Sequence, residues 1–186
     1  MLQINKMHDQ IVINFAAEEL KKYLRMMMPE EKVVNIAYAP EATEGFRLGL
    51  LEDFGLPCES DNVLLDDIVH IDADANGGII AGSNPRSVLL AVYKYLTING
   101  CRWLYPGVDG EHVPIADIAP QKYHKLADHR FRGHCNEGAE YQACMLETID
   151  FYAKQECNVY MIEFDIPYVY YNFYYSPAFT PTRPAE

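Results

Sequence analysis

Five polar side chains in the last third of the sequence have the types and spacing to contact a polar substrate: Arg132, His134, Glu137, Glu163 and Asp165. An arginine presents a planar fork of N–H donors that suits a carboxylate or a pair of hydroxyls. Barrel enzymes place such groups at the carboxyl ends of parallel strands, so we predict that His134, Glu137, Glu163 and Asp165 line a substrate site. For Arg132 a second interpretation, an ion pair between domains, stays open.

The segments that must carry these side chains have the pattern of a strand, a helix and a second strand. Phe131–Cys135 is strand-like, apolar residues recur at helical spacing from Met145 to Ala153, and Val159–Asp165 is strand-like again. Two strands joined by a helix require a parallel sheet, and an isolated pair cannot bury both of its faces. We therefore expect residues 121–186 to be the beginning of a (β/α)8 barrel, truncated after its first strand–helix–strand unit.

Residues 1–120 are predicted to form a separate α+β domain, a sheet with two helices on one face. The segments expected to be strands are Ile11–Ile13, Val33–Tyr38, Phe46–Leu51, and the arms of a hairpin around Asn76-Gly77, Ile68–Ala73 and Gly78–Ala81. One helix is expected to follow an N-cap at Asn14 and to end at Met28. The other is expected to follow an N-cap at Asn84 and to end at a C-terminal glycine, Gly100.

Composition and missing motifs exclude several classes of function. A net charge of −12 without a cluster of Lys and Arg disfavours nucleic acid and anionic membranes as partners. The five scattered cysteines lack zinc-ligand spacing and are expected to be reduced thiols, and neither phosphate-loop pattern is present. We therefore expect no cofactor and no metal. The start of the sequence has no signal peptide, so the protein is expected in the cytoplasm unless a signal was removed.

Four aspartates surround the predicted hairpin: Asp66, Asp67, Asp72 and Asp74. Carboxylates in such a group can bind calcium, but these lack the spacing of an EF-hand loop. The sequence therefore favours a solvated hairpin face over a calcium site.

Two stretches that follow the predicted hairpin resemble a known module. They are Ala81-Gly82-Ser83-Asn84-Pro85-Arg86-Ser87 through Tyr93, and Asn99-Gly100-Cys101-Arg102-Trp103-Leu104-Tyr105-Pro106-Gly107 followed by Gly110-Glu111-His112-Val113-Pro114. In their order they resemble the N-terminal domain shared by bacterial α-glucuronidases, β-hexosaminidases and related glycoside hydrolases, in which this domain precedes a catalytic barrel. The resemblance covers most of residues 10–115, and Arg132-Gly133 and Asn158-Val159-Tyr160 match the first two strands of those barrels.

The resemblance implies the N-terminal portion of a glycosidase that hydrolyses O-glycosidic bonds of a uronic-acid or acetamido sugar. It assigns Arg132 to sugar hydroxyls and implies no catalytic residue in residues 1–120. The catalytic acid of such barrels follows a later strand, so the fragment itself is expected not to be catalytic. Glu163 and Asp165 do not replace it, because they share one face of a strand whereas hydrolysis needs carboxyl groups on opposite sides of the scissile bond.

Two further features bear on partners. Trp103 follows a helix end directly and is expected to be buried in a core or interface rather than to serve as a sugar platform. The tyrosine-rich segment from Tyr168 to Phe179 could stack on sugars or be apolar surface meant to be covered, which would favour self-association. The competing hypothesis is a non-catalytic carbohydrate-binding or adaptor module.

Overall fold

The computed structural model describes residues 2–30, 34–136 and 142–162. The chain has a mixed α+β fold and divides into two compact units. The first unit contains residues Met1–Arg102 and His112–Arg130, and the second contains Trp103–Glu111 and Phe131–Glu186. Each unit is described by itself.

The first unit is built on a mixed six-stranded sheet with the order β2-β1-β3-β5-β4-β8. β1 pairs in parallel with β2 and β3, and β3 pairs in parallel with β5, whereas β4 is antiparallel to both β5 and β8. The strands are β1 (Leu2–Lys6), β2 (Val34–Tyr38), β3 (Phe46–Leu50), β4 (Ile68–Asp74), β5 (Gly77–Gly82) and β8 (Gln121–Leu126). Residues 121–126, which the sequence assigns to the second domain, thus complete the sheet of the first unit.

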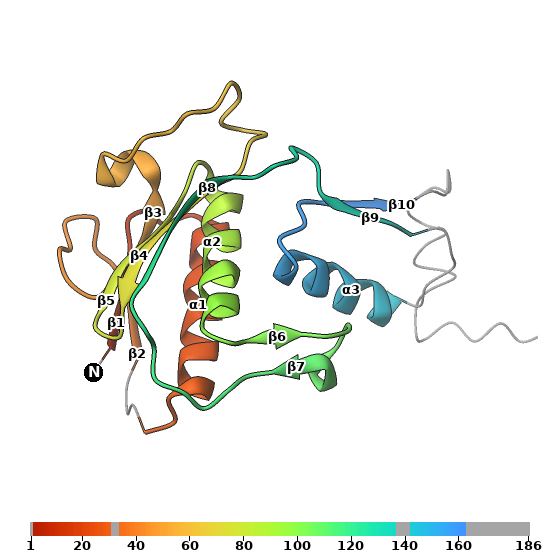
Figure 1. The fold of residues 1–186 in the computed structure, drawn as a ribbon, viewed down its shortest axis with the longest axis horizontal. Coiled ribbons are helices and arrows are strands. Elements are labelled where there is room, and N and C mark those ends of the chain that lie inside the picture. The colour runs from red at the N-terminus through yellow and green to blue at the C-terminus, as the bar shows by residue number, and fades with distance from the viewer. Residues whose placement is uncertain (1, 31–33, 137–141, 163–186) are drawn as a thin grey trace, which may run out of the picture. The chain divides into compact units, whose positions relative to one another are not determined.

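Helices α1 (Ile11–Met27) and α2 (Pro85–Ile98) lie side by side on one face of this sheet (Figure 1). The prediction of a strand over Ile11–Ile13 is wrong, because these residues are the first turn of α1. Ile13 is fully buried and continues the apolar helical stripe of Ala16, Ala17 and Leu20, so burial of that face overrides the β-propensity of isoleucine. The helix begins after Gln10, and no side chain caps it.

Several local predictions are confirmed. The hairpin of β4 and β5 turns where Gly77 has a φ of 135°, a conformation that glycine adopts freely. Asn84 caps α2, because its side chain accepts a hydrogen bond of 2.9 Å from the amide of Ser87, and Pro85 is the first helical residue. Gly100, one residue beyond the C-cap of α2, has a φ of 99°.

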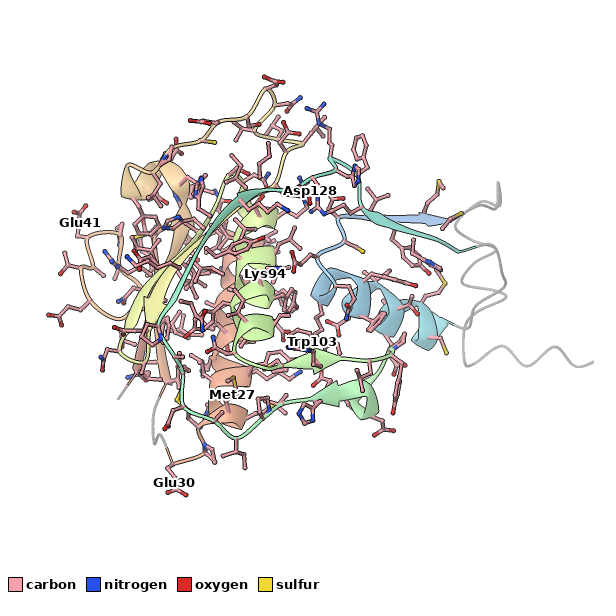
Figure 2. All side chains as sticks on the ribbon, in the orientation of Figure 1. Met27, Glu30, Glu41, Lys94, Trp103 and Asp128 are labelled. Carbon is pink, nitrogen blue, oxygen red and sulfur yellow. The ribbon has the colours of Figure 1, made fainter. Side chains whose placement is uncertain are left out.

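The core of the first unit fills the space between the sheet and the two helices, as the side chains in Figure 2 show. Phe46 of β3 packs edge-to-face on Tyr95 of α2, with ring centroids 5.8 Å apart. The helices contact each other through a buried hydrogen bond of 3.0 Å from the Tyr93 hydroxyl to Glu19 Oε2. At the edge of the sheet, the ammonium group of Lys94 in α2 lies over the ring of Tyr123 in β8. This contact attaches β8 to α2.

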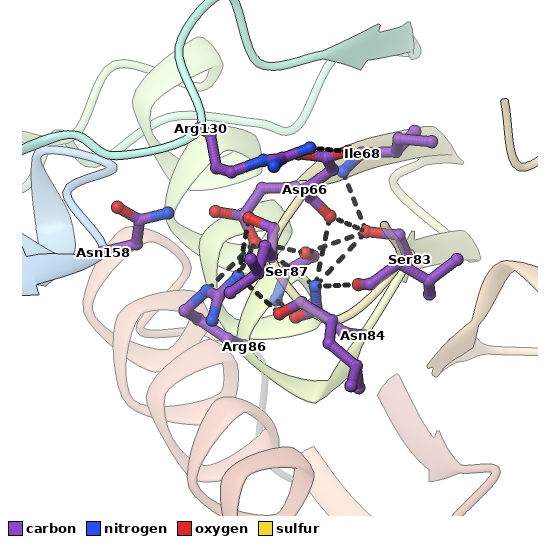
Figure 3. Close-up of polar contacts among 12 residues, drawn as sticks. Asp66, Ile68, Ser83, Asn84, Arg86, Ser87, Arg130 and Asn158 are labelled. Carbon is purple, nitrogen blue, oxygen red and sulfur yellow. Dashed lines mark hydrogen bonds and ion pairs between the residues drawn. The ribbon is translucent and has the colours of Figure 1, made fainter. Parts of the chain in front are cut away.

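Two of the four aspartates that were expected to be solvated are instead buried at the start of β4. Asp67 Oδ1 accepts hydrogen bonds from Ser87 Oγ at 2.7 Å and from Arg86 Nε at 3.0 Å (Figure 3). Asp66 forms a two-point ion pair with Arg130, at 2.6 and 3.1 Å. The network ties the start of β4 to the first turn of α2 and to the segment after β8.

The remaining two aspartates agree with the expectation of a polar hairpin surface. Asp72 forms an exposed ion pair of 3.3 Å with Lys122 on β8. Asp74 accepts a hydrogen bond of 2.7 Å from the backbone amide of Asn76 in the hairpin turn. No group of three or more potential metal ligands occurs within the described residues.

The second unit contains a strand–helix–strand arrangement, as predicted. β9 (Gly133–Asn136) and β10 (Val159–Ile162) pair in parallel, and α3 (Gln142–Lys154) lies between them in sequence. Before this arrangement in the sequence, β6 (Arg102–Trp103) pairs with β7 (Glu111–His112). A short helix, η2 (Val108–Gly110), connects these two strands. In the first unit a further short helix, η1 (Leu51–Phe54), follows β3.

The ion pair between Asp66 and Arg130 predicts a defined loss of stability in acid. The hydrogen bonds from Arg130 and then Ser60 lower the pKa of Asp66 to about 2. Because the folded-state pKa lies below the unfolded value, this stabilisation is complete above the ordinary carboxyl pKa and is lost as the pH falls towards 2. Arg130→Gln should therefore be less stable than the wild type at pH 5, and the difference should shrink steadily between pH 4 and pH 2.

Urea denaturation followed by far-UV circular dichroism at four pH values measures this difference. Arg25→Gln is the matched control, since Arg25 is an exposed arginine on α1, and it should follow the wild type at every pH. A difference between wild type and Arg130→Gln that stays constant from pH 5 to pH 2 would contradict the assigned role of the pair.

Candidate functional site

Arg132 lies directly before β9, at the amino end of the parallel strand pair. Its amide donates a hydrogen bond of 2.9 Å to Asn158 Oδ1, and the amide of Asn158 donates one of 2.8 Å to the Arg132 carbonyl. The Arg132 side chain donates from Nε to the carbonyl of Glu156 at 3.0 Å. Arg132 therefore holds the turn between α3 and β10.

This turn is conformationally unusual. Glu156 has a φ of 63°, in the left-handed region that a residue with a side chain seldom adopts. Helix-ending hydrogen bonds support it: the amide of Glu156 donates to the carbonyl of Ala153, and the amide of Cys157 donates to that of Tyr152. The Arg132 contact to the Glu156 carbonyl adds a side-chain support from β9, so this arginine stabilises the crossover itself.

His134 of β9 lies on the face of the strand pair that α3 covers. Its ring stacks on Tyr152 of α3 with centroids 4.7 Å apart and planes 15° from parallel. Tyr160, its neighbour in register on β10, also lies near Tyr152, with centroids 6.5 Å apart. In a barrel this face is the one turned towards the helices, so the stack is packing between strand and helix.

The carboxyl ends of β9 and β10 are the paired residues Asn136 and Ile162. Glu137 and Glu163 follow these two residues in the sequence, and Asp165 comes two residues later. All three lie outside the described residues. The structure thus places Arg132 and His134, one at the amino end and one under α3, and does not bring them together at the carboxyl edge.

A buried cation joins Trp103 and Glu111 to the end of α3 within the second unit. Lys154, in the last turn of α3, is only 4% exposed and donates to Glu111 Oε1 at 2.8 Å and to Asp150 Oδ2 at 2.5 Å. The same ammonium lies 5.9 Å from the ring centroid of Trp103. Gln155 donates a hydrogen bond of 2.8 Å to the Trp103 carbonyl.

Trp103 (labelled in Figure 2) is 6% exposed, which confirms the prediction of a buried ring. Sequence reasoning recognised the tryptophan but missed Lys154 as its neighbour. A lysine at the end of an amphipathic helix is usually solvated, and only its near-complete burial reveals the pairing.

A hollow of about 710 Å³ lies in the first unit beside β1, β3 and the hairpin turn. Amides, carboxylates and one cation line it: Gln3, Asn5, Asn76, Glu41, Glu44, Asp74 and Arg47. Arg47 Nε is buried and has no hydrogen-bond partner among the described residues, while its guanidinium carbon lies 5.8 Å from the ring centroid of Phe54. Sequence patterns did not single out this hollow, because its residues come from separate strands.

The remaining observations concern thiols and membranes. All five cysteines lie in the described part of the chain and are free, as predicted, and burial raises the pKa of the Cys157 thiol. Of the helices in the described ranges, none is long and apolar enough to cross a membrane.

No family model matches the chain, and no curated protein is similar enough to count as a relative.

Removing one partner of the pair between Lys154 and Glu111 should strongly destabilise the second unit. Lys154→Met leaves a mostly buried carboxylate without its cation, which typically costs about 3–5 kcal/mol. The double variant Lys154→Met with Glu111→Gln should be less destabilised than the sum of the two single variants, because neither charge is then left alone. Fluorescence of Trp103, the one tryptophan in the sequence, reports the unfolding of this unit in urea.

Asp150→Asn is the control for this series. Its carboxylate is half-exposed and contacts the same ammonium, so its loss should cost no more than about 1 kcal/mol. Strictly additive effects of Lys154→Met and Glu111→Gln would show that the two groups do not stabilise each other.

Proposed function

We propose that this chain is the N-terminal portion of a glycoside hydrolase that acts on O-glycosidic bonds of a uronic-acid or acetamido sugar. The first unit is an accessory domain of the kind that precedes the barrels of α-glucuronidases and β-hexosaminidases. The second unit contributes the first strand–helix–strand of a (β/α)8 barrel. The portion described by this sequence is not itself catalytic.

One observation carries the proposal: within the described residues, α3 packs on one face of the parallel pair β9 and β10, while the opposite face of β10 is exposed. Val159 is 37% exposed and Met161 is 54% exposed, and alternation along β10 puts both on the face opposite Tyr160. Parallel sheets are normally buried on both faces. Further strands closing into a barrel would cover this face with inward-pointing side chains.

The outer side of α3 supports the same architecture. Leu146 is 64% exposed and Ile149 is 44% exposed, although both are apolar. In a barrel the helices form a ring, and each one packs against its neighbours as well as against the strands. These two side chains are suitably placed on the helix to be covered by such neighbours.

The substrate end of such a barrel is the carboxyl edge of the strands, beyond Asn136 and Ile162. Glu137, Glu163 and Asp165 follow this edge in sequence and are the residues proposed to contact sugar hydroxyls. Arg132 lies at the opposite end of β9, where its contacts with Glu156 and Asn158 support the fold. We therefore assign the substrate contacts to the carboxylates first.

Calorimetric titration of the chain with glucuronate and with N-acetylglucosamine tests these contacts. One of the two sugars should bind, and Glu163→Gln and Glu137→Gln should each weaken it by about tenfold, equivalent to about 1.4 kcal/mol of lost hydrogen bonding. Glu147→Gln is the matched control, because Glu147 is an exposed carboxylate on α3, and it should leave binding unchanged.

Absence of heat with both sugars would remove the proposed sugar contacts. Hydrolysis of chromogenic glycosides above background by the same protein would contradict the expectation that the catalytic acids lie on later strands.

The coding sequence that follows residue 186 tests the barrel without an assay. We expect it to continue in frame with alternating strand and helix patterns, each unit about 30 residues long. Carboxylates at the ends of later strands would supply the acid and base. A continuation without such alternation would contradict the barrel.

The hollow beside Arg47 favours one alternative, a non-catalytic carbohydrate-binding module in the first unit. Its amides, carboxylates and guanidinium are suitable partners for sugar hydroxyls. The same titration separates the two functions, because binding that is lost in Arg47→Met and retained in Glu163→Gln supports the alternative. The first proposal requires the reverse.

A further inference from the structure

Two histidines from distant parts of the sequence face each other on the sheet of the first unit. His70 of β4 and His124 of β8 are directly opposite in the antiparallel register. Their Nδ1 atoms are 3.0 Å apart, with ring centroids separated by 5.2 Å and planes inclined by 66°. No other histidines among the described residues pair in this way.

The pair lies on the sheet face that the helices do not cover. Ile71 and Ala73, which alternate with His70 along β4, are buried on the helix side. Along this face, the neighbouring cross-strand pair on one side is Ile68 with Leu126, and on the other side Asp72 with Lys122. The row therefore contains an apolar pair, the two imidazoles and an ion pair in succession.

The surroundings of His70 favour its neutral form. Lys122 neutralises Asp72 at 3.3 Å, and within the described ranges no carboxylate hydrogen-bonds to either ring. Partial burial, together with the neighbouring His124, lowers the pKa of His70. A neutral imidazole offers an unprotonated ring nitrogen, which is the form that binds metal ions.

We propose that His70 and His124 form a two-histidine site for a divalent transition-metal ion. If an ion bound at about 2.0–2.1 Å from both Nδ1 atoms, the angle between the two nitrogens at the metal would be about 94°. This angle matches adjacent positions of a square-planar or octahedral ion. Imidazole suits Cu²⁺, Ni²⁺ and Zn²⁺, in contrast to Ca²⁺ or Mg²⁺.

Solvent or a small chelating ligand completes the coordination, because the described residues provide no third ligand in a cluster. A bound ion would take the place of the proton that the two nitrogens otherwise share. It would also link the edge strand β8 to β4 through side chains, in addition to the backbone ladder. The site is independent of the proposed sugar contacts, which lie in the other unit.

Titration of the full, untagged chain with Cu²⁺–iminodiacetate tests the site, because this complex leaves two adjacent copper positions open. We expect one complex to bind per chain. His70→Gln and His124→Gln should each weaken binding by at least about tenfold, since one imidazole then remains. His112→Gln is the matched control, because His112 is exposed and away from the pair, and it should bind like the wild type.

Electron spin echo spectroscopy of the wild-type complex counts coordinated imidazoles without any substitution. Two imidazoles per copper are expected, and a spectrum with one or none would overturn the proposal. Equal affinity of the wild type, His70→Gln and His124→Gln would overturn it as well. Circular dichroism of each variant verifies that β8 is still folded, and the spectrum of the wild type decides the question if a variant does not fold.

Discussion

The arrangement of the second unit depends on the mostly buried cation of Lys154. Its ammonium neutralises Glu111, contacts Asp150 and lies near the ring of Trp103, so one side chain fixes the segment 103–111 on the end of α3. A mostly buried lysine is tolerated only with such partners. The same end of α3 leads into the left-handed Glu156 and the contact from Arg132. Charge pairing, rather than a large apolar core, therefore defines the crossover between the two parallel strands.

The first unit uses the same device at a different place. Asp67 receives Arg86 and Ser87 at the start of α2, while Asp66 receives Arg130 from the segment after β8. Arg130 is more than sixty residues from Asp66 in the sequence, so this contact joins distant parts of the chain. The neighbouring residues Asp66 and Asp67 thus hold two different segments of the chain at the start of β4. An acidic protein retains specific geometry here because its few cations are placed where buried carboxylates require them.

Local signals in the sequence predicted local structure well. Asn76-Gly77 indicated the hairpin, and Asn84-Pro85 indicated the start of α2, because each feature depends on the conformations of neighbouring residues. Ile11–Ile13 was misjudged because the burial of Ile13 on the apolar face of α1 outweighs β-propensity. The facing of His70 and His124 could not be predicted, since it depends on how β8 registers with β4 across fifty-four residues. For the site, the sequence indicated Trp103 but not its ionic partners, and the predicted carboxylates Glu137, Glu163 and Asp165 lie outside the described residues.

The chain passes between the two units three times, after Arg102, after Glu111 and after Arg130. A single cut in the chain therefore cannot separate the two units, because part of one unit stays on the piece that carries the other. Shortening the chain before residue 121 would remove the edge strand β8 and would separate Glu111 from Lys154. The two units are interleaved along the sequence rather than arranged one after the other.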